Sequence, residues 1–234
     1  MAGIVAPLIR FDGVCKSFKD SQALSDISFQ LMEGERFCLL GHSGAGKTTL
    51  LQIAAGLIDA DAGSVWLEGR EASAIPPHKR KIGFIFQDYA LFPHLTAIEN
   101  ICFGLNGMPR DKAHSIAEAL LERVYLQAKA QSYPSSLSGG QKQRLALART
   151  LAPAPGLILM DEPFSGLDAP LRHEMRSFTL ELLQQSNIAC LMVTHDPEDA
   201  LAITEHVGVI EQGRLTAFGK AKEMLSASPI ARTG

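Results

Sequence analysis

The chain has 234 residues, 46% of them hydrophobic, and a formal net charge of −3 at pH 7. This length and apolar content predict one domain with an ample core, and the slightly negative charge argues against a general nucleic-acid surface. We expect no signal peptide, and no apolar run approaches the about 18 residues that span a bilayer. The four cysteines form no Cys-x-x-Cys pair, and two that fall in predicted buried strands, Cys38 and Cys190, are typical of reduced core residues in a cytosolic protein.

The first third of the chain is dominated by strand-like runs. Short apolar stretches predict strands at 9–11, 27–31 and 64–67. The pattern then becomes helical from about residue 88 to about residue 150, most clearly in the amphipathic stretch 112–124. Beyond about residue 156 strands and helices alternate again, and a strand at 207–210 is followed by a Gln212-Gly213 hairpin turn. Such alternation predicts an α/β fold.

A glycine-rich segment at 41–49 fits the pattern G-x-x-x-x-G-K-[ST] of phosphate-binding loops. Apolar residues at 36–40 predict a strand that enters the loop, and 48–55 predicts a helix that leaves it; a chance glycine-rich turn would lack this context. In such a loop Lys47 reaches the β- and γ-phosphates, and the Thr48 hydroxyl ligates Mg²⁺. The residues expected to contact a nucleotide here are Gly41, Ser43, Gly44, Ala45, Gly46, Lys47, Thr48 and Thr49.

A second glycine motif follows the helical region and precedes another helical pattern. A serine and two glycines at a helix start can form an anion-binding nest, although an ordinary N-cap is the alternative. One chain would then hold two phosphate-binding motifs but one catalytic set, and two head-to-tail copies would close two ATP sites across a two-fold interface. The motif is Leu137, Ser138, Gly139, Gly140 and Gln141.

The apolar run at 157–160 ends in two acids, Asp161 and Glu162. A strand buried on both faces of a parallel sheet has such a run, and its carboxyl end is where open α/β sheets bind ligands. Two adjacent acids would repel a polyphosphate without a cation, so the pair implies Mg²⁺ when it lies beside Lys47. Asp161 then fits the metal ligand and Glu162 the general base that activates water. A solvated acidic turn is the alternative.

In this order and over nearly the whole chain, these segments resemble the nucleotide-binding subunit of an ABC transporter. The resemblance implies a P-loop NTPase with a parallel-sheet core, an N-terminal antiparallel β subdomain and an inserted helical subdomain at about 88–150. It implies that 1–234 is one ABC ATPase domain without a carboxy-terminal regulatory domain. It also implies ATP and Mg²⁺ as cofactors, and a homodimer in which ATP lies between the phosphate loop of one subunit and the Ser138–Gln141 signature of the other.

The resemblance assigns further roles. His195, which follows the apolar run 188–193, stands at the position of the switch histidine that contacts the γ-phosphate; a histidine after a strand is otherwise usually structural. Gln87 matches the Q-loop glutamine, which touches Mg²⁺ and the attacking water. Asp168 ends the D-loop that crosses between subunits. Phe18 matches an aromatic residue that stacks on adenine, and its alternative is a core phenylalanine.

The segment after Gln87 resembles that of bacterial importer ATPases for iron, polyamines, sulfate, sugars or thiamine. Its apolar residues would line a groove for a short helix of the membrane permease, or else pack inside the helical lobe. These residues are Tyr89, Leu91, Phe92 and Leu95. The family pattern has proline more often at His42 and alanine at Gly166, and we expect neither departure to affect ATP hydrolysis.

The resemblance therefore predicts an ATPase that powers import of a small solute. It would sit on the cytoplasmic face of the plasma membrane, bound to permease subunits and served indirectly by a solute-binding protein. Rival hypotheses are an exporter ATPase, an ABC-type ATPase of DNA repair or translation, a catalytically silent subunit and a P-loop kinase. Glu162 and His195 argue against a silent subunit, and the LSGGQ motif has no role in a kinase. The sequence does not identify the solute.

Overall fold

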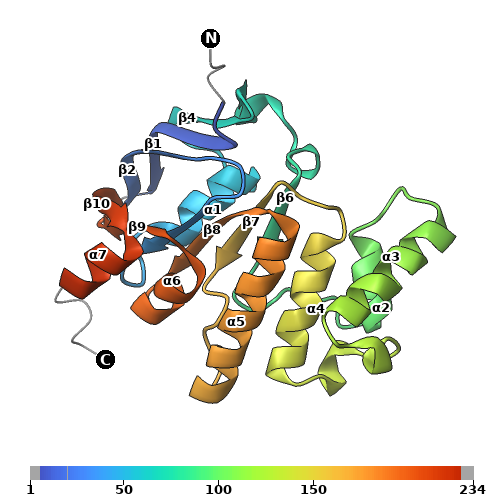
Figure 1. Ribbon diagram of the computed structural model, residues 1–234. Coiled ribbons are helices and arrows are strands. Elements are labelled where there is room, and N and C mark those ends of the chain that lie inside the picture. The colour runs from blue at the N-terminus through green and yellow to red at the C-terminus, as the bar shows by residue number, and fades with distance from the viewer. Residues whose placement is uncertain (1–5, 20, 228–234) are drawn as a thin grey trace, which may run out of the picture.

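The structure is a computed structural model that describes residues 6–19 and 21–227 (Figure 1). Its larger sheet has six strands in the order β10-β9-β3-β8-β7-β6, with parallel neighbours except at the β9-β10 hairpin. The strands are β3 (Arg36–Leu40), β6 (Ile82–Ile85), β7 (Leu157–Asp161), β8 (Ala189–Thr194), β9 (His206–Glu211) and β10 (Arg214–Lys220). Because β7 and β8 are buried along their whole length, the sheet is covered on both faces. The expected α/β class is confirmed.

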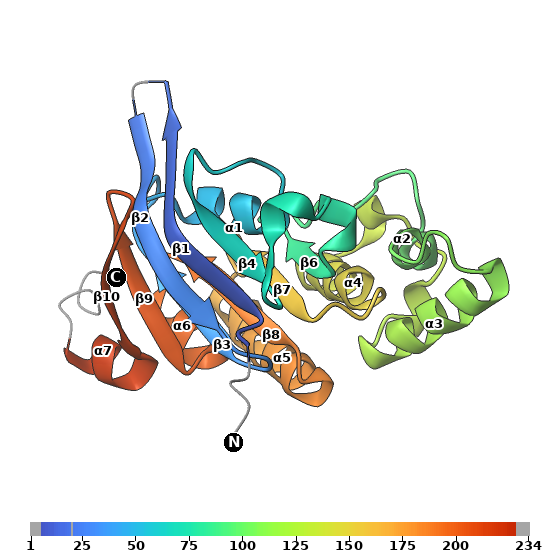
Figure 2. The same ribbon diagram turned by 90° about the horizontal axis from the view of Figure 1, so that it is seen from above.

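The smaller sheet is antiparallel and has the order β2-β1-β4-β5. Its strands are β1 (Ile9–Phe18), β2 (Ser21–Leu31), β4 (Ala62–Leu67) and β5 (Arg70–Glu71). Seen from above, its strands lie over one side of the larger sheet (Figure 2). Ala23 of β2 lies against Gly46 in the loop that precedes α1. The predicted strands at 9–11, 27–31 and 64–67 all fall within these elements, so the antiparallel subdomain is confirmed.

Alternate residues along the strands of the larger sheet pack into two different hydrophobic cores. In β3, Phe37 and Leu39 pack into the cluster shared with the smaller sheet and α1. Cys38 and Leu40 point to the opposite face and pack into the cluster shared with the other helices. This is the period-2 alternation of a strand with both faces buried. Cys38 and Cys190 are free and buried, and burial raises the pKa of the Cys190 thiol to about 12.

The helices are α1 (Lys47–Ala55), α2 (Ala97–Phe103), α3 (Arg110–Arg123), α4 (Gly139–Leu151), α5 (Ala169–Ser186), α6 (Pro197–Ile203) and α7 (Ala221–Ala227). The first three after α1 lie between β6 and β7 in the chain and form the helical subdomain, at the opposite end of the molecule from α7 (Figure 1). Among the helices within the described ranges, none is long and apolar enough to cross a membrane.

One strand of the larger sheet, β6, differs from the prediction, whereas the hairpin between β9 and β10 agrees with it. The strand β6 was not predicted, because it has only four residues and one of them is a glycine. The hairpin at Gln212-Gly213 is confirmed, with left-handed φ angles of 47° and 75°. Its turn packs against the phosphate loop, where the Gly213 N–H donates to the carbonyl of Ala45 at 3.2 Å. The hairpin therefore supports the phosphate loop through a backbone hydrogen bond.

Candidate functional site

The segment 41–49 has the expected arrangement: 41–46 forms the loop after β3, and 47–49 opens α1. Lys47 is buried, and its Nζ donates to the carbonyls of Gly41 at 2.6 Å and His42 at 3.0 Å. Gly46 precedes the helix with a φ of 100°, and a Cβ there would lie 2.2 Å from the carbonyl oxygen of Ala23. Only glycine fits this close approach. The loop therefore packs tightly on β2 while its N–H groups remain at a helix start, where anions bind.

An open cavity of about 440 Å³ lies in front of the loop. Its lining includes the entire segment from His42 to Thr49 together with three residues that are distant in sequence, Gln87, Glu162 and His195. The strand ends of the larger sheet bring these residues together, because parallel neighbours end at the same edge. Thus the cavity collects the loop and three of the predicted catalytic residues in a single chain.

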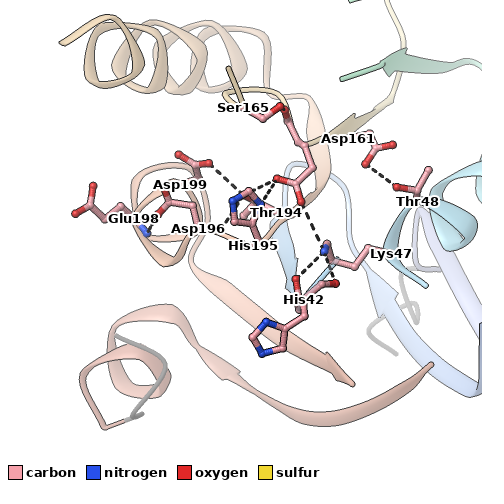
Figure 3. Close-up of polar contacts among 12 residues, drawn as sticks. His42, Lys47, Thr48, Asp161, Ser165, Thr194, His195, Asp196, Glu198 and Asp199 are labelled. Atoms are coloured by element: carbon pink, nitrogen blue, oxygen red, sulfur yellow. Dashed lines mark hydrogen bonds and ion pairs between the residues drawn. The ribbon is translucent and has the colours of Figure 1, made fainter. Parts of the chain in front are cut away.

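Asp161 and Thr48 supply a pair of potential metal ligands at the side of this cavity. The Thr48 hydroxyl donates to Asp161 Oδ1 at 2.9 Å (Figure 3). Burial raises the pKa of the Asp161 carboxyl, with a contribution from neighbouring Glu162, whereas the Thr48 hydrogen bond and Lys47 lower it. The described part of the chain contains no cluster of three or more His, Cys, Asp or Glu side chains suited to a metal. One hydroxyl and one carboxylate fit Mg²⁺, which takes its other ligands from phosphates and water.

Glu162 is the centre of the polar contacts at the cavity. Its Oε2 lies 2.8 Å from His195 Nδ1, and its Oε1 lies 3.6 Å from Lys47 Nζ. The backbone of Glu162 is left-handed, with φ of 45°, and its carbonyl accepts from the Ser165 hydroxyl at 2.9 Å. His195 itself is exposed, with 63% of its side chain accessible. A carboxylate held between an imidazole and an ammonium group at a phosphate-binding loop is placed to accept a proton from water.

The signature segment lies outside this cavity in the same chain. Ser138 is the N-cap of α4 and forms a capping box with Gln141: the Gln141 N–H donates to Ser138 Oγ at 3.3 Å, and the Ser138 N–H donates to Gln141 Oε1 at 2.9 Å. The N-cap alternative thus describes the local geometry. Contact of Ser138, Gly139, Gly140 and Gln141 with a phosphate remains a prediction that requires a second chain.

Phe18 lies at the end of β1, and Asp168 lies at the start of α5. Phe18 closes β1 with 46% of its surface exposed, so the alternative of a core phenylalanine is wrong. Lys16 Nζ lies 5.5 Å from the Phe18 ring centroid. Asp168 is the N-cap of α5 and accepts from the Leu171 N–H at 2.9 Å. The stacking of Phe18 on adenine and the crossing of Asp168 to a partner remain predictions.

Two residues that the sequence analysis missed hold the segment after Gln87. Asn100, fully buried on α2, accepts from the Phe92 N–H at 2.9 Å and donates to the carbonyls of Phe92 and Leu95. Arg149, on α4, donates to the carbonyls of Tyr89 at 2.8 Å and Ala90 at 2.5 Å. In the sequence, the feature that could have indicated a structural role for Asn100 is a polar residue at a core-facing position of an amphipathic helix.

The apolar side chains of this segment are divided between packing and exposure. Leu91 packs against the hydrophobic core that the helical subdomain shares with the larger sheet. The Phe92 ring lies 4.2 Å, centroid to centroid, from that of Phe103, which is 54% exposed. Burial raises the pKa of the Tyr89 hydroxyl. Leu91 therefore supports the packing alternative, whereas Phe92 and Phe103 together present an aromatic surface.

The fold and the cavity define a nucleotide-binding protein of the P-loop class. Residues 24–165 match the family described as ABC transporter, and the chain belongs to that family. It is 46% identical over 224 residues to the sulfate/thiosulfate import ATP-binding protein CysA 1 of Chromobacterium violaceum, covering 93% of this chain and 63% of that protein. It is 40% identical over 222 residues to the putrescine transport ATP-binding protein PotG of Escherichia coli, covering 94% of this chain and 59% of that one.

A solved structure has the same fold. The dimeric post-hydrolysis state of the ATP-binding cassette MJ0796, bound to ADP and Pi, superposes with a TM-score of 0.81 at 29% identity and covers 91% of this chain and 98% of that one. This confirms the expected P-loop NTPase fold with its β subdomain. The chain spans 63% of the length of CysA 1.

Proposed function

We propose that this chain is the ATP-binding and ATP-hydrolysing subunit of an importer for a small solute. The observation that carries the proposal is the placement of Glu162, 2.8 Å from His195 and 3.6 Å from Lys47 at the mouth of the phosphate loop. The names of the two relatives described above, which specify import or transport, favour import over export, DNA repair or translation. In this role the chain would work with membrane permease subunits, at the cytoplasmic face of the membrane.

The residues of the cavity divide the work of hydrolysis. The loop N–H groups and Lys47 bind the β- and γ-phosphates. Thr48 and Asp161, with Gln87 at the cavity wall, would hold Mg²⁺, and the ion would neutralise charge on the phosphate oxygens. Glu162 orients the attacking water and takes its proton, and His195 holds Glu162 and reaches toward the γ-phosphate.

Two copies of the chain complete the machinery. The Ser138–Gln141 segment of one copy would cover the phosphate loop of the other, in a two-fold arrangement that gives two sites. Its helix start and serine hydroxyl supply donors for the γ-phosphate. The dimeric state of MJ0796, a cassette of the same fold, supports this arrangement. Phe18, exposed at the end of β1, would stack on adenine.

The experiment is a comparison of ATP turnover by the wild-type chain and three variants in the presence of Mg²⁺. Lys47→Ala should weaken nucleotide binding, because the loop loses its phosphate cation. Glu162→Gln should bind ATP but lose about 10²–10⁴-fold in kcat, since an amide cannot accept the proton. Glu122→Gln, on the exposed face of α3, is the matched control and should behave as wild type. Near-normal turnover by Glu162→Gln would contradict the proposal.

A further inference from the structure

A buried hydroxyl lies behind the proposed catalytic carboxylate. Thr194 ends β8 and is completely buried. Its Oγ1 lies 3.3 Å from Glu162 Oε2 and 3.1 Å from Asp199 Oδ2, and it accepts the Asp196 N–H at 3.1 Å (Figure 3). None of the roles assigned above uses Thr194. The same Glu162 oxygen that contacts His195 is therefore held from its buried side as well.

The Thr194 hydroxyl has one hydrogen and two carboxylate acceptors. It can donate to only one of them at a time, while its lone pairs accept from the Asp196 backbone. When it donates to Glu162, it stabilises the carboxylate in the rotamer that faces the cavity. When it donates to Asp199, Glu162 keeps only its cavity-side contacts. The orientation of this hydroxyl therefore controls how firmly Glu162 is held.

Asp199, the second acceptor of the Thr194 hydroxyl, is held in place by contacts with the helices. Asp199 is 3% exposed, and Arg176 Nε on α5 donates to its Oδ1 at 2.6 Å. Arg176 also pairs with Asp196 at 3.1 Å and with Glu198 at 2.9 Å. A multiply bonded guanidinium makes a rigid anchor. This anchor holds the side chains of Asp196, which directly follows His195, and of Asp199, which is the second acceptor of the Thr194 hydroxyl.

We propose that Thr194 is a positioning residue for hydrolysis: its hydroxyl, which accepts from the Asp196 N–H, donates to Glu162 and holds this carboxylate in the orientation that receives the proton of water. The inference rests on the proposed function, since it assigns a part in the same reaction. It concerns the chemical step rather than nucleotide binding, because Thr194 lies outside the lining of the phosphate cavity. Loss of the hydroxyl should therefore lower kcat and leave KM unchanged.

The test is the steady-state ATPase activity of Thr194→Val, which keeps the shape of the side chain and removes the hydroxyl. We expect kcat to fall at least tenfold while the KM for ATP stays within twofold. Thr194→Ser restores the hydroxyl and should recover kcat to within threefold of wild type. If Thr194→Val does not fold, Thr194→Cys replaces it, since a thiol is a weak donor of similar size, and the same split between kcat and KM is expected.

The chain offers a matched control. Thr179 on α5 is also buried, and its Oγ1 has no hydrogen-bond partner within residues 6–19 and 21–227. Thr179→Val makes the same chemical change at a buried position of the neighbouring helix, and it should leave both kcat and KM unchanged. Equal losses in Thr179→Val and Thr194→Val would assign the effect to packing and overturn the inference. Wild-type kcat in Thr194→Val would overturn it as well.

A crystal structure of the Thr194→Val protein separates this inference from the proposed function. We expect the Glu162 carboxylate to leave its contact with His195 Nδ1, which is 2.8 Å in the wild-type chain. An unchanged contact would overturn the inference even if the wild-type chain hydrolyses ATP. A wild-type chain without ATPase activity would overturn the proposed function, and the position of Glu162 in the variant would still decide whether Thr194 holds it.

Discussion

The loop around Lys47 and the segment Ser138–Gln141 both stand at a helix start, yet their surroundings differ. The loop opens on a cavity to which Gln87, Glu162 and His195 also contribute. The signature segment satisfies its own polar groups through a capping box and lines no part of that cavity. One chain thus brings the proposed catalytic residues together by itself, whereas the signature segment would acquire a ligand only if another chain supplied one.

The strongest test of this difference is to block the signature segment. Ser138→Arg places a long cation where the partner's phosphate loop would dock. It should reduce ATP turnover about 100-fold or more, as the loss of a key donor does, although Ser138 touches no catalytic residue of its own chain. Turnover and ATP affinity are to be measured together, and Ser136→Arg, two residues earlier and exposed, is the control. Normal turnover in Ser138→Arg would mean that one chain suffices.

Assembly provides the next test. ATP should bring two copies together, most visibly in Glu162→Gln, where the closed state cannot reset. Light scattering should then report twice the mass of the 25.2 kDa chain. Adding Ser138→Arg to Glu162→Gln should return the protein to a monomer. A Glu162→Gln protein that stays monomeric in saturating Mg-ATP contradicts the two-fold arrangement. Mixed dimers of Ser138→Arg with Lys47→Ala should retain at most one intact site.

The segment Tyr89–Leu95 tests whether the nucleotide cavity is linked to a membrane partner. Phe92→Asp puts a charge into the aromatic surface shared with Phe103, and an uncompensated charge in an apolar contact is costly. We expect solute uptake and permease binding to be lost while basal ATP turnover remains. Thermal unfolding is the control: a protein that no longer folds would support the packing alternative, and intact uptake would place the contact elsewhere.

Asn100 offers a measurable effect on stability. Its side chain bonds the backbone of Phe92 and Leu95, so Asn100→Ala leaves buried polar groups without partners. The expected loss is about 2 kcal/mol in the free energy of unfolding. Denaturant titration measures it, and Asn106→Ala, at an exposed position after α2, is the matched control. A loss below about 0.5 kcal/mol would mean that water replaces these bonds.

The sequence predicted the parts of the site that depend on local pattern. The strand at 36–40, the helix at 48–55 and the two acids at the end of the run 157–160 follow from apolar runs and glycines, and the structure has them within a residue or two. The roles of Thr194 and Asn100 were not predicted. Each acts through residues that are brought near only by the packing of strands and helices, and a buried threonine in a strand carries no signal of its partner.

The smallest expected effect concerns Phe18, which is exposed at the end of β1. If its ring stacks on adenine, Phe18→Ala should weaken ATP binding by about 1 kcal/mol, or roughly fivefold, and Phe18→Trp should preserve it. Inorganic tripolyphosphate has no base to stack, so its affinity should be the same in all three proteins. Equal losses for ATP and tripolyphosphate would instead assign the effect to Lys16, whose ammonium group lies 5.5 Å from the ring centroid. Phe18 does not line the phosphate cavity. A loss of affinity confined to ATP would therefore show that the adenine base is bound by a separate, exposed surface of the same chain.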